Sequence, residues 1–309
     1  EFSGNSFHLH TYMGVYEIRD RDEAVSIMVD KANIAADTIK NNYDCCVAYY
    51  DEHLLEISIE QRRLLGEFEP ALQNDEFVMY LQPQVKRDGA AKGAEALVRW
   101  VHPSRGILTP YAFIDILENA GLIYKLDLYI WEKAAQKLAE WKEKGYGSYH
   151  ISVNISTKDF YIIDIYETFT GLINKYGIAA SNLHLEITET TLMTDFEKNM
   201  NIIHKLQGVG FRVEIDDFGS GYSSLNMLKD ISADVLKIDM GFLRKSENEV
   251  KGQDILESII TLAGKIGMDV ITEGVETKKQ LDMLTMMGCH EFQGYYFSKP
   301  IPVEEFEQK

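Results

Sequence analysis

The feature that most constrains the fold is a regular alternation of strand-like and helix-like segments between residues 76 and 297. The strand-like segments are short apolar runs, rich in Val, Ile, Phe and Tyr and bounded by turn residues. Strands that alternate with helices of about ten residues or more pair in parallel. About eight strands over about 230 residues fit a TIM-type (β/α) barrel. The first two runs, FVMYLQP and GAEALVRW, are close enough to form a hairpin. The later segments include one helix over 158–175, a short helix near 222–228 and a last strand in HEFQGYYF.

A doubly wound open sheet is the alternative, since it too is built from parallel strands and helices. Such a sheet often carries a glycine-rich dinucleotide-binding sequence in its first strand–helix turn, and no such sequence occurs here. The sequence therefore favours an α/β protein with a TIM-type barrel.

The N-terminal residues have a different character. Residues 1–50 predict a strand, a helix and a second strand, which are too few elements for an independent core. Residues 51–75 predict a charged helical linker. The predicted organisation is thus a small α+β fragment over 1–50, a helical linker over 51–75, and the barrel over 76–309.

Charge and composition exclude several classes of function. The 309 residues carry a formal net charge of -18, which argues against binding a nucleic-acid polymer through its backbone. A small phosphorylated ligand remains compatible, because divalent metals turn an acidic pocket into an anion site. No apolar run approaches the roughly 18 residues of a membrane span, so no direct membrane contact is expected.

The ends of the chain and its cysteines suggest where the protein works. Three cysteines do not make a disulfide framework, which favours a reducing cytoplasm. The chain has no signal peptide and does not begin with Met, so we expect a piece of a longer protein whose sensor or membrane anchor lies upstream.

Polar residues recur where the strand-like runs end. The C-terminal ends of parallel barrel strands converge on one mouth, so these residues are expected to meet. Each alone is compatible with an ion pair or a helix cap, but their common placement favours one metal-dependent site. Carboxylate and amide oxygens suit magnesium and manganese. The candidates are Glu95, Arg99, Asn154, Glu186, Glu189, Asp216, Asp217, Lys237, Glu273, Glu276 and Gln293.

For two pairs among these residues, more than one interpretation is open. Glu95 and Arg99 lie on one face of a strand, either as an internal ion pair or as a metal ligand beside an anion-binding arginine. Asp216 and Asp217 repel each other and would point to opposite faces of a strict strand. The FGSGYSS loop that follows could break the strand and let both face the mouth.

Taken together, these residues resemble the EAL-domain family of cyclic di-GMP phosphodiesterases over roughly residues 70 to 306. The matching motifs are EALVRW from Glu95, VNIS from Val153, EITE from Glu186, DDFGSGYSS from Asp216, LKID from Leu236, EGVE from Glu273 and QGY from Gln293. Small departures are Leu81 before Gln82 and Met240 after Asp239. The resemblance implies a barrel whose first strand runs antiparallel to the others.

The resemblance also implies a two-metal site for Mg²⁺ or Mn²⁺. One metal would be held by Glu95, Asn154, Glu186 and Asp216. Asp216 would bridge to a second metal that also takes Asp217. The catalytic residues would be Lys237, Glu273, Gln293 and Glu95. Lys237 would orient or polarise the attacking water, and Glu273 and Gln293 would hold metal-bound waters or the nucleophile.

Further roles follow from the same resemblance. Gln82 and Arg99 match positions that contact the ligand. Glu189 would anchor the loop from Asp217 to Ser224, and Glu276 would support the loop that carries Glu273. Residues 1–50 resemble the C-terminal end of a GGDEF diguanylate cyclase domain. The signature loop of that domain is absent, so no cyclase activity is expected in this chain.

The resemblance thus implies a bacterial signalling enzyme, a homodimer that hydrolyses cyclic di-GMP to linear pGpG and lowers the level of this second messenger. One rival is a degenerate EAL module that binds cyclic di-GMP without cleaving it; its sign would be a lost ligand such as Glu95 or Asp216, and neither is lost. A second rival is a TIM-barrel enzyme of the enolase type, which gives no reason for the LEITET and DDFGSGYSS segments.

Overall fold

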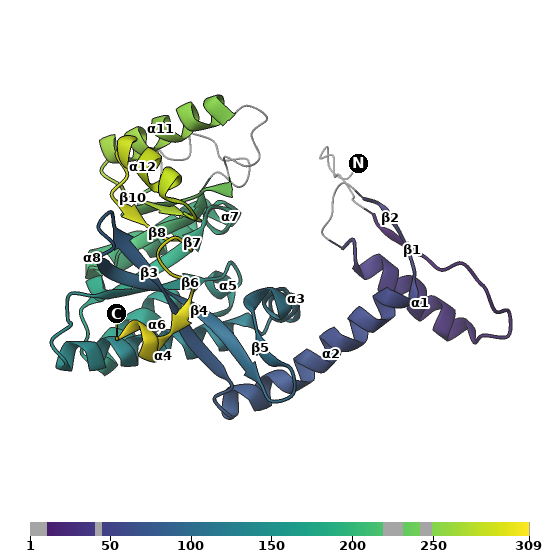
Figure 1. The fold of residues 1–309 in the computed structure, drawn as a ribbon. Coiled ribbons are helices and arrows are strands. Elements are labelled where there is room, and N and C mark those ends of the chain that lie inside the picture. Colours follow the sequence, from purple (N-terminus) through teal and green to yellow (C-terminus); the bar gives the residue numbers. More distant parts are fainter. Residues whose placement is uncertain (1–10, 41–44, 219–230, 242–248, 309) are drawn as a thin grey trace, which may run out of the picture. The chain divides into compact units, whose positions relative to one another are not determined.

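The computed structural model describes residues 11–40, 45–218, 231–241 and 249–308, and the chain divides into two compact units, Glu1–Pro70 and Ala71–Lys309. In the first unit, strands β1 (Met13–Val15) and β2 (Val47–Tyr49) pair in parallel beside helix α1 (Val25–Asp37) (Figure 1). Helix α2 (Glu52–Gln73) follows them in the sequence. The unit has the predicted strand–helix–strand order, while its relation to a GGDEF domain stays a prediction.

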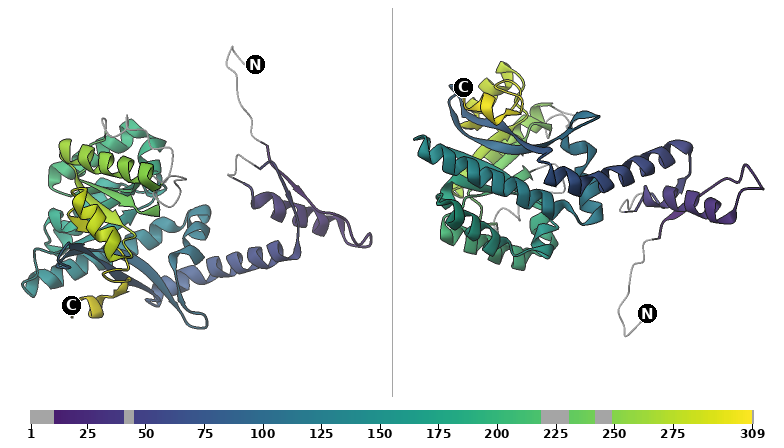
Figure 2. Two further views of the ribbon diagram at one scale, coloured as in Figure 1. Left: turned by 45° about the horizontal axis from the view of Figure 1, so that its top comes forward. Right: turned by 90° about the horizontal axis from the view of Figure 1, so that it is seen from below.

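The second unit is a closed barrel of eight strands, and it confirms the predicted TIM-type fold (Figures 1 and 2). The sheet does not stay open, so the doubly wound alternative is wrong. Around the barrel the strands are β3 (Phe77–Lys86), β4 (Ala91–His102), β6 (His150–Ile155), β7 (Leu183–Thr188), β8 (Val213–Phe218), β9 (Val235–Asp239), β10 (Asp269–Glu273) and β11 (Glu291–Phe292).

The predicted hairpin closes this barrel. β3 pairs antiparallel with both β4 and β11, whereas the remaining neighbours in the ring pair in parallel. β3 is therefore the antiparallel first strand that was expected. Two short strands, β5 (Gly106–Leu108) and β12 (Ile301–Pro302), extend the sheet antiparallel to β4 and β3.

Helices lie outside the strands (Figure 2). They are the 3₁₀ turns η1 (Pro110–Ala112) and η2 (Ala180–Asn182) and the helices α3 (Ile114–Ala120), α4 (Ile123–Glu143), α5 (Asp159–Ile162), α6 (Ile165–Tyr176), α7 (Glu189–Thr194), α8 (Phe196–Val209), α11 (Glu249–Lys265), α12 (Lys278–Met286) and α13 (Val303–Phe306). Among the described residues, none of these helices is long and apolar enough to cross a membrane.

Three segments differ from the sequence-based prediction or cannot be compared with it. The single helix expected over 158–175 is two helices, because Asp164 caps α6 by accepting a hydrogen bond from the Glu167 amide. The strand expected in HEFQGYYF is only the two residues of β11. The short helix expected near 222–228 lies outside the described residues.

The inside of the barrel is polar, and its apolar core lies between the strands and the helices. Alternate strand residues such as Ile151, Val153 and Leu185 are fully buried on the outer face of the strands. Buried polar residues of the strands and of the segment after β11 include Gln82, Gln84, Glu95, His150, Ser152, His184, Glu186, Glu214, Lys237 and Gln293. This arrangement lets charged residues occupy the interior without interrupting the main apolar core.

Two loops meet closely where the last strands end. The Val275 amide donates to the Gln293 carbonyl at 3.2 Å, and the Tyr296 amide donates to the Val275 carbonyl at 2.9 Å. Gly294 lies between these contacts, and a β-carbon there would be 2.2 Å from the Val275 carbonyl oxygen. The close backbone approach therefore requires glycine, and it places Gln293 beside the strand that carries Glu273.

We predict that Gly294→Ala lowers the stability of the barrel by about 3 kcal/mol, because two backbone segments must separate to admit one methyl group. Gly171→Ala, in the middle of α6 with no atom within 4 Å of the added carbon, is the control. It should raise stability by about 0.5–1 kcal/mol. Urea unfolding measures both variants. Equal stability of Gly294→Ala and the parent chain would contradict the close approach.

Candidate functional site

The centre of the site is the ammonium group of Lys237, a fully buried residue of β9. Its Nζ lies 2.9 Å from Glu186 Oε2, 2.9 Å from Glu273 Oε1, 3.4 Å from Glu95 Oε2 and 3.4 Å from Asp216 Oδ1. The four carboxylates come from β7, β10, β4 and β8. Residues as far apart in sequence as Glu95 and Glu273 therefore meet, as the strand-end pattern predicted.

Amide side chains hold Glu95 from two sides. Asn154 Nδ2 donates to Glu95 Oε1 at 3.1 Å, and Gln293 Nε2 donates to Glu95 Oε2. Gln293 Nε2 also lies 3.2 Å from Gln82 Oε1, and Gln82 Nε2 donates to the Ser298 carbonyl at 3.3 Å. The ion pair of Glu95 is thus with Lys237, and the predicted amide residues surround the carboxylate.

The strand pattern breaks at the two adjacent aspartates. Asp217 has φ of 57°, and the pairing of β8 with β9 is irregular between Ile215 and Phe218. A positive φ is uncommon for a residue other than glycine, and aspartate is among the side chains that tolerate it. Partial desolvation and then the charge of Asp216 raise the pKa of the Asp217 carboxyl. The two side chains therefore escape the strict alternation that would separate them.

The carboxylates exceed the positive charge that Lys237 supplies. Burial would lower the pKa of Lys237, but the surrounding carboxylates raise it well above its usual range. Burial and the charge of Glu95 raise the pKa of Glu186 far above that of a free carboxyl. Burial, opposed by Lys237, brings the pKa of Glu273 to about 8. The site as folded is deficient in cations.

The donor set fits a hard divalent metal ion. Glu186 Oε1 is buried without a hydrogen-bond partner in the part of the chain that the structure describes. Asp216 Oδ1 likewise has only its ion-pair contact with Lys237 there. Carboxylate and amide oxygens are the ligands that Mg²⁺ and Mn²⁺ prefer. The sequence-predicted ligands Glu95, Asn154 and Glu186 lie around these unsatisfied atoms.

The remaining predicted residues lie at the rim. Arg99 is half-buried, donates to the Val98 carbonyl at 2.7 Å and places its guanidinium 5.5 Å from the ring centre of Tyr80. Glu189 is the first residue of α7, and Glu276 is exposed, with its backbone amide donating to Gln280. The loop that Glu189 was expected to anchor lies outside the described residues from 219 onward.

A second polar layer lies deeper in the barrel, and the sequence analysis missed it. His184 Nδ1 is 2.6 Å from Glu214 Oε1, and His184 Nε2 is 3.2 Å from the Ser181 carbonyl. His150 Nε2 is 2.7 Å from Gln84 Oε1. A signal for this layer exists, because His184 and Glu214 each stand two residues before a predicted ligand and so share its face.

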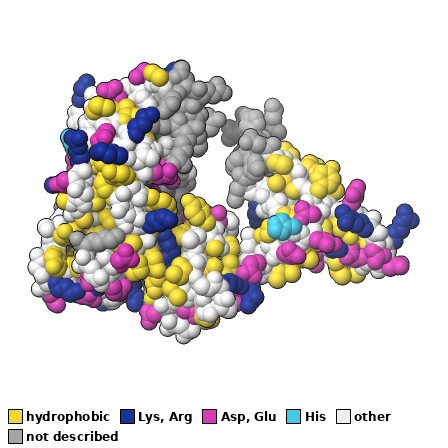
Figure 3. Space-filling model, viewed as in Figure 1, with side chains coloured by type: hydrophobic (Ala, Val, Ile, Leu, Met, Phe, Trp, Pro, Cys, Tyr) yellow, Lys and Arg dark blue, Asp and Glu magenta, His cyan; other side chains and the backbone are white. Residues whose placement is uncertain are grey.

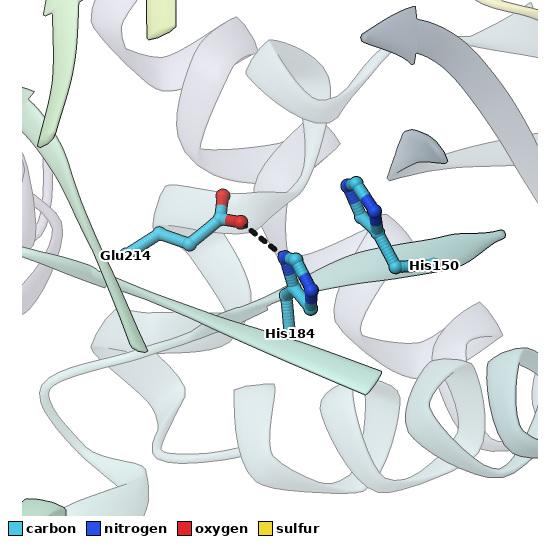
Figure 4. A group of neighbouring side chains, drawn as sticks. All are labelled: His150, His184 and Glu214. Atoms are coloured by element: carbon cyan, nitrogen blue, oxygen red, sulfur yellow. Dashed lines mark hydrogen bonds and ion pairs between the residues drawn. The ribbon is translucent and has the colours of Figure 1, made fainter. Parts of the chain in front are cut away.

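This layer balances charge rather than forming a metal centre. The rings of His150 and His184 stack 3.8 Å apart with 4° between their planes, so no single ion can lie in both ring planes, where the nitrogen lone pairs point (Figure 4). Burial would raise the pKa of Glu214, but the hydrogen bond and charge of His184 hold it at about 2. Burial lowers the pKa of His150 to about 3, so that imidazole is neutral. Gly93 leaves room for the His150 ring.

Comparison with known proteins gives a consistent result. The family model described as EAL domain matches residues 66–300. The bifunctional diguanylate cyclase/cyclic di-GMP phosphodiesterase MucR of Pseudomonas aeruginosa is 32% identical over 88% of this chain and 39% of its own length. Cyclic di-GMP phosphodiesterase PdeR of Escherichia coli is 33% identical over 77% of this chain and 36% of its own length.

Solved structures agree with the fold. The structure described as PaMucR phosphodiesterase in complex with c-di-GMP matches with a TM-score of 0.75 and 33% identity, over 79% of this chain and 99% of that chain. By contrast, this chain spans well under half the length of the two curated relatives.

We predict that the metal-free protein becomes less stable as pH rises from about 4.5, the ordinary pKa of a glutamate, to about 8. A carboxyl whose pKa is raised on folding binds its proton more tightly in the folded state, so its stabilisation is lost as pH rises through the folded pKa, which is about 8 for Glu273. Glu273→Gln should flatten this slope, whereas Glu257→Gln, an exposed change on α11, should not. Urea unfolding in the presence of a chelator measures the free energy of unfolding at each pH. The same pH dependence for the parent chain and Glu273→Gln would refute the raised pKa of Glu273.

Proposed function

This chain belongs to the EAL domain family, and on that basis we propose that residues 71–309 hydrolyse cyclic di-GMP. The observation that carries the proposal is the fully buried Lys237 amid four carboxylates from four strands of the barrel. Two of its relatives are named as cyclic di-GMP phosphodiesterases, and a structural neighbour is described as a complex with that ligand. No predicted site residue is replaced in this chain, which speaks against a receptor that has lost activity.

We propose that Glu95, Asn154, Glu186 and Asp216 hold one Mg²⁺ or Mn²⁺, and that Asp216 and Asp217 hold a second. Ions bound in this way acidify water and neutralise charge on phosphoryl oxygens. The deficit of positive charge around Lys237 supports this assignment, since two further cations would balance it.

The chain's own groups would then serve the transfer. Lys237 points into the carboxylate cluster, where its ammonium donates to the attacking water and favours loss of the water proton. The Glu273 carboxylate, which pairs with Lys237, can take up that proton when it is ionised. The water oxygen bonds to phosphorus, the bond from phosphorus to the ribose 3′ oxygen breaks, and that oxygen takes a proton from solvent, which leaves linear pGpG.

Substrate recognition is assigned to the rim. A guanidinium binds phosphate oxygens in a planar, two-point geometry, and half-buried Arg99 can offer it there. Gln82 lies beside Gln293 and is placed to read the ligand next to the reacting centre. On the face drawn in Figure 3, Lys and Arg side chains are interspersed with Asp and Glu, which supports a small ligand rather than a nucleic-acid polymer.

The partners and regulation are also proposals. We propose a cytoplasmic homodimer in which Glu189 ties the loop after Asp217 to the metal site, with Glu276 supporting the loop of Glu273. Glu189 begins the helix that directly follows β7, so its backbone is continuous with the strand of Glu186. A signal from elsewhere in a longer protein would reach the metals through that loop.

We predict that Mg²⁺ or Mn²⁺ supports turnover of cyclic di-GMP and that Ca²⁺ binds but supports little, because the larger ion acidifies water less. Asp216→Asn should lower kcat by at least about 100-fold, or about 2.7 kcal/mol of transition-state stabilisation. Asp282→Asn, on the outer helix α12, is the matched control and should retain activity. Full activity in Ca²⁺ alone, or similar rates for the two variants, would sink the metal assignment.

Lys237→Ala separates catalysis from recognition. We expect kcat to fall by about 100-fold or more, because the variant loses the cation that favours the water's deprotonated form. Affinity for cyclic di-GMP in Ca²⁺, measured by calorimetry, should change far less, since Lys237 is buried beneath the mouth. Equal losses of affinity and rate would move Lys237 from the chemistry to substrate binding.

A further inference from the structure

The segment that follows β6 is tied to helix α4. Trp131 Nε1 donates to the backbone carbonyl of Asn154 at 2.9 Å, and the buried Trp131 ring packs on Phe169 with 4.5 Å between ring centres. α4 also packs against β6 and the short helix α5. The backbone of the proposed ligand Asn154 thus takes its position partly from α4.

A pair of aspartates makes a second contact between α4 and the turn that follows β6. The Ser156 amide donates to Asp159 Oδ2 at 2.9 Å, and the Asp159 amide donates to the Ser156 carbonyl at 3.2 Å. Asp159 is fully buried, and its Oδ1 meets no amide or hydroxyl donor among the described residues. The carboxyl that hydrogen-bonds Asp159 belongs to Asp127, which lies one turn before Trp131 on α4.

Asp159 is fully buried and Asp127 is half-buried, so two negative charges in contact there are unfavourable, and the pair is expected to share one proton. The Ser156 amide favours negative charge on Asp159, which makes Asp127 the proton donor. Burial, followed by the charge of Asp159, raises the pKa of Asp127 well above its usual range. The proton gives the Asp159 carboxyl a hydrogen bond from Asp127 in addition to the one from the Ser156 amide.

The other charged groups near the pair come from α3 and the turn before α5. Burial, and then the charge of Asp115, raise the pKa of Glu118. Lys158 donates to the Glu118 carbonyl and is the nearby cation in the described chain that acts on this carboxyl. This acidic surrounding further disfavours a second charge on the pair.

We infer that Asp127 is a positioning residue for the metal ligand Asn154: its protonated carboxyl bridges α4 to Asp159 and fixes the turn that follows Asn154. The inference rests on the proposed metal site, and it assigns a role to residues that neither contact Lys237 nor line the mouth. Partners that orient a ligand typically change metal affinity by about 10- to 100-fold when they are removed.

The sign of the pH effect follows from the shared proton. The hydrogen bond is intact at pH values below the raised pKa of Asp127 and is lost as pH rises through it. Loss of the proton places two negative charges side by side, and the turn from Ser156 to Asp159 loosens. Asn at position 127 keeps a donor at all pH values, whereas Leu has a similar shape and no donor.

The test uses the full chain with Asp127→Asn, Asp127→Leu and the matched control Glu132→Leu. Glu132 is on α4 as well, but it accepts from Tyr176 at 2.6 Å and pairs with Lys175 on α6. Ca²⁺ binding by calorimetry is the readout, so hydrolysis is not required. We expect Asp127→Leu to weaken Ca²⁺ binding about tenfold or more. Asp127→Asn and Glu132→Leu should stay within about twofold of the parent chain.

Two results would overturn the inference. Unchanged Ca²⁺ affinity in Asp127→Leu would show that the bridge does not position Asn154, and an equal loss in Asp127→Asn would show that the donated hydrogen is not the cause. If Asp127→Leu does not fold, the pH series decides. As pH rises through the raised pKa of Asp127, the parent should lose Ca²⁺ affinity relative to Asp127→Asn, and a constant ratio of the two affinities would contradict the shared proton.

The same measurements distinguish failure of the proposed hydrolysis from failure of the positioning role of Asp127. A chain that binds Ca²⁺ with the expected dependence on position 127 but does not hydrolyse cyclic di-GMP would support the positioning role and reject the catalytic proposal. A parent chain that binds no divalent ion would overturn the metal site and this inference together.

Discussion

The ion cluster around Lys237 joins five strands of the barrel at one point. A buried ammonium is costly to desolvate, and each of its carboxylate partners is costly too, so the cluster is stable only when charges and hydrogen bonds balance. Lys237 lies within 3.4 Å of four carboxylate oxygens, one from each of four residues on four strands. The barrel brings those four strands together. The excess negative charge of their carboxylates favours the binding of cations.

The polar interior below the cluster serves the same balance. Glu214 neighbours Glu186 in the pairing of β7 with β8, so two buried carboxylates lie side by side. His184 compensates Glu214 by hydrogen bonding and charge, which leaves Glu186 to interact with Lys237 above. Such an interior would weaken an ordinary core, but here the apolar core is formed between strands and helices, where residues such as Val153 and Leu185 are fully buried.

Much of this arrangement was predictable from the sequence, because it depends on periodicity. Alternating strands and helices predicted the barrel, the short spacing before Glu95 predicted the hairpin, and strand ends predicted which residues meet. The sequence-based prediction was wrong in one place. The single helix predicted over 158–175 is divided in the structure, because Asp164 caps the start of α6. The Asp127–Asp159 contact was beyond the sequence, because it joins a helix to a turn 32 positions away, and no local pattern encodes that distance.

Divalent cations are expected to complete the charge balance around Lys237. The most direct measurement is a crystal structure of the protein grown with Mn²⁺, with anomalous diffraction data to locate the metal. We predict an anomalous peak in contact with Glu95, Asn154, Glu186 and Asp216 oxygens, and a second between Asp216 and Asp217, with Lys237 still beside Glu273. Mn²⁺ absent from these residues at saturating concentration, with the carboxylates bound to Lys237 alone, would contradict the account.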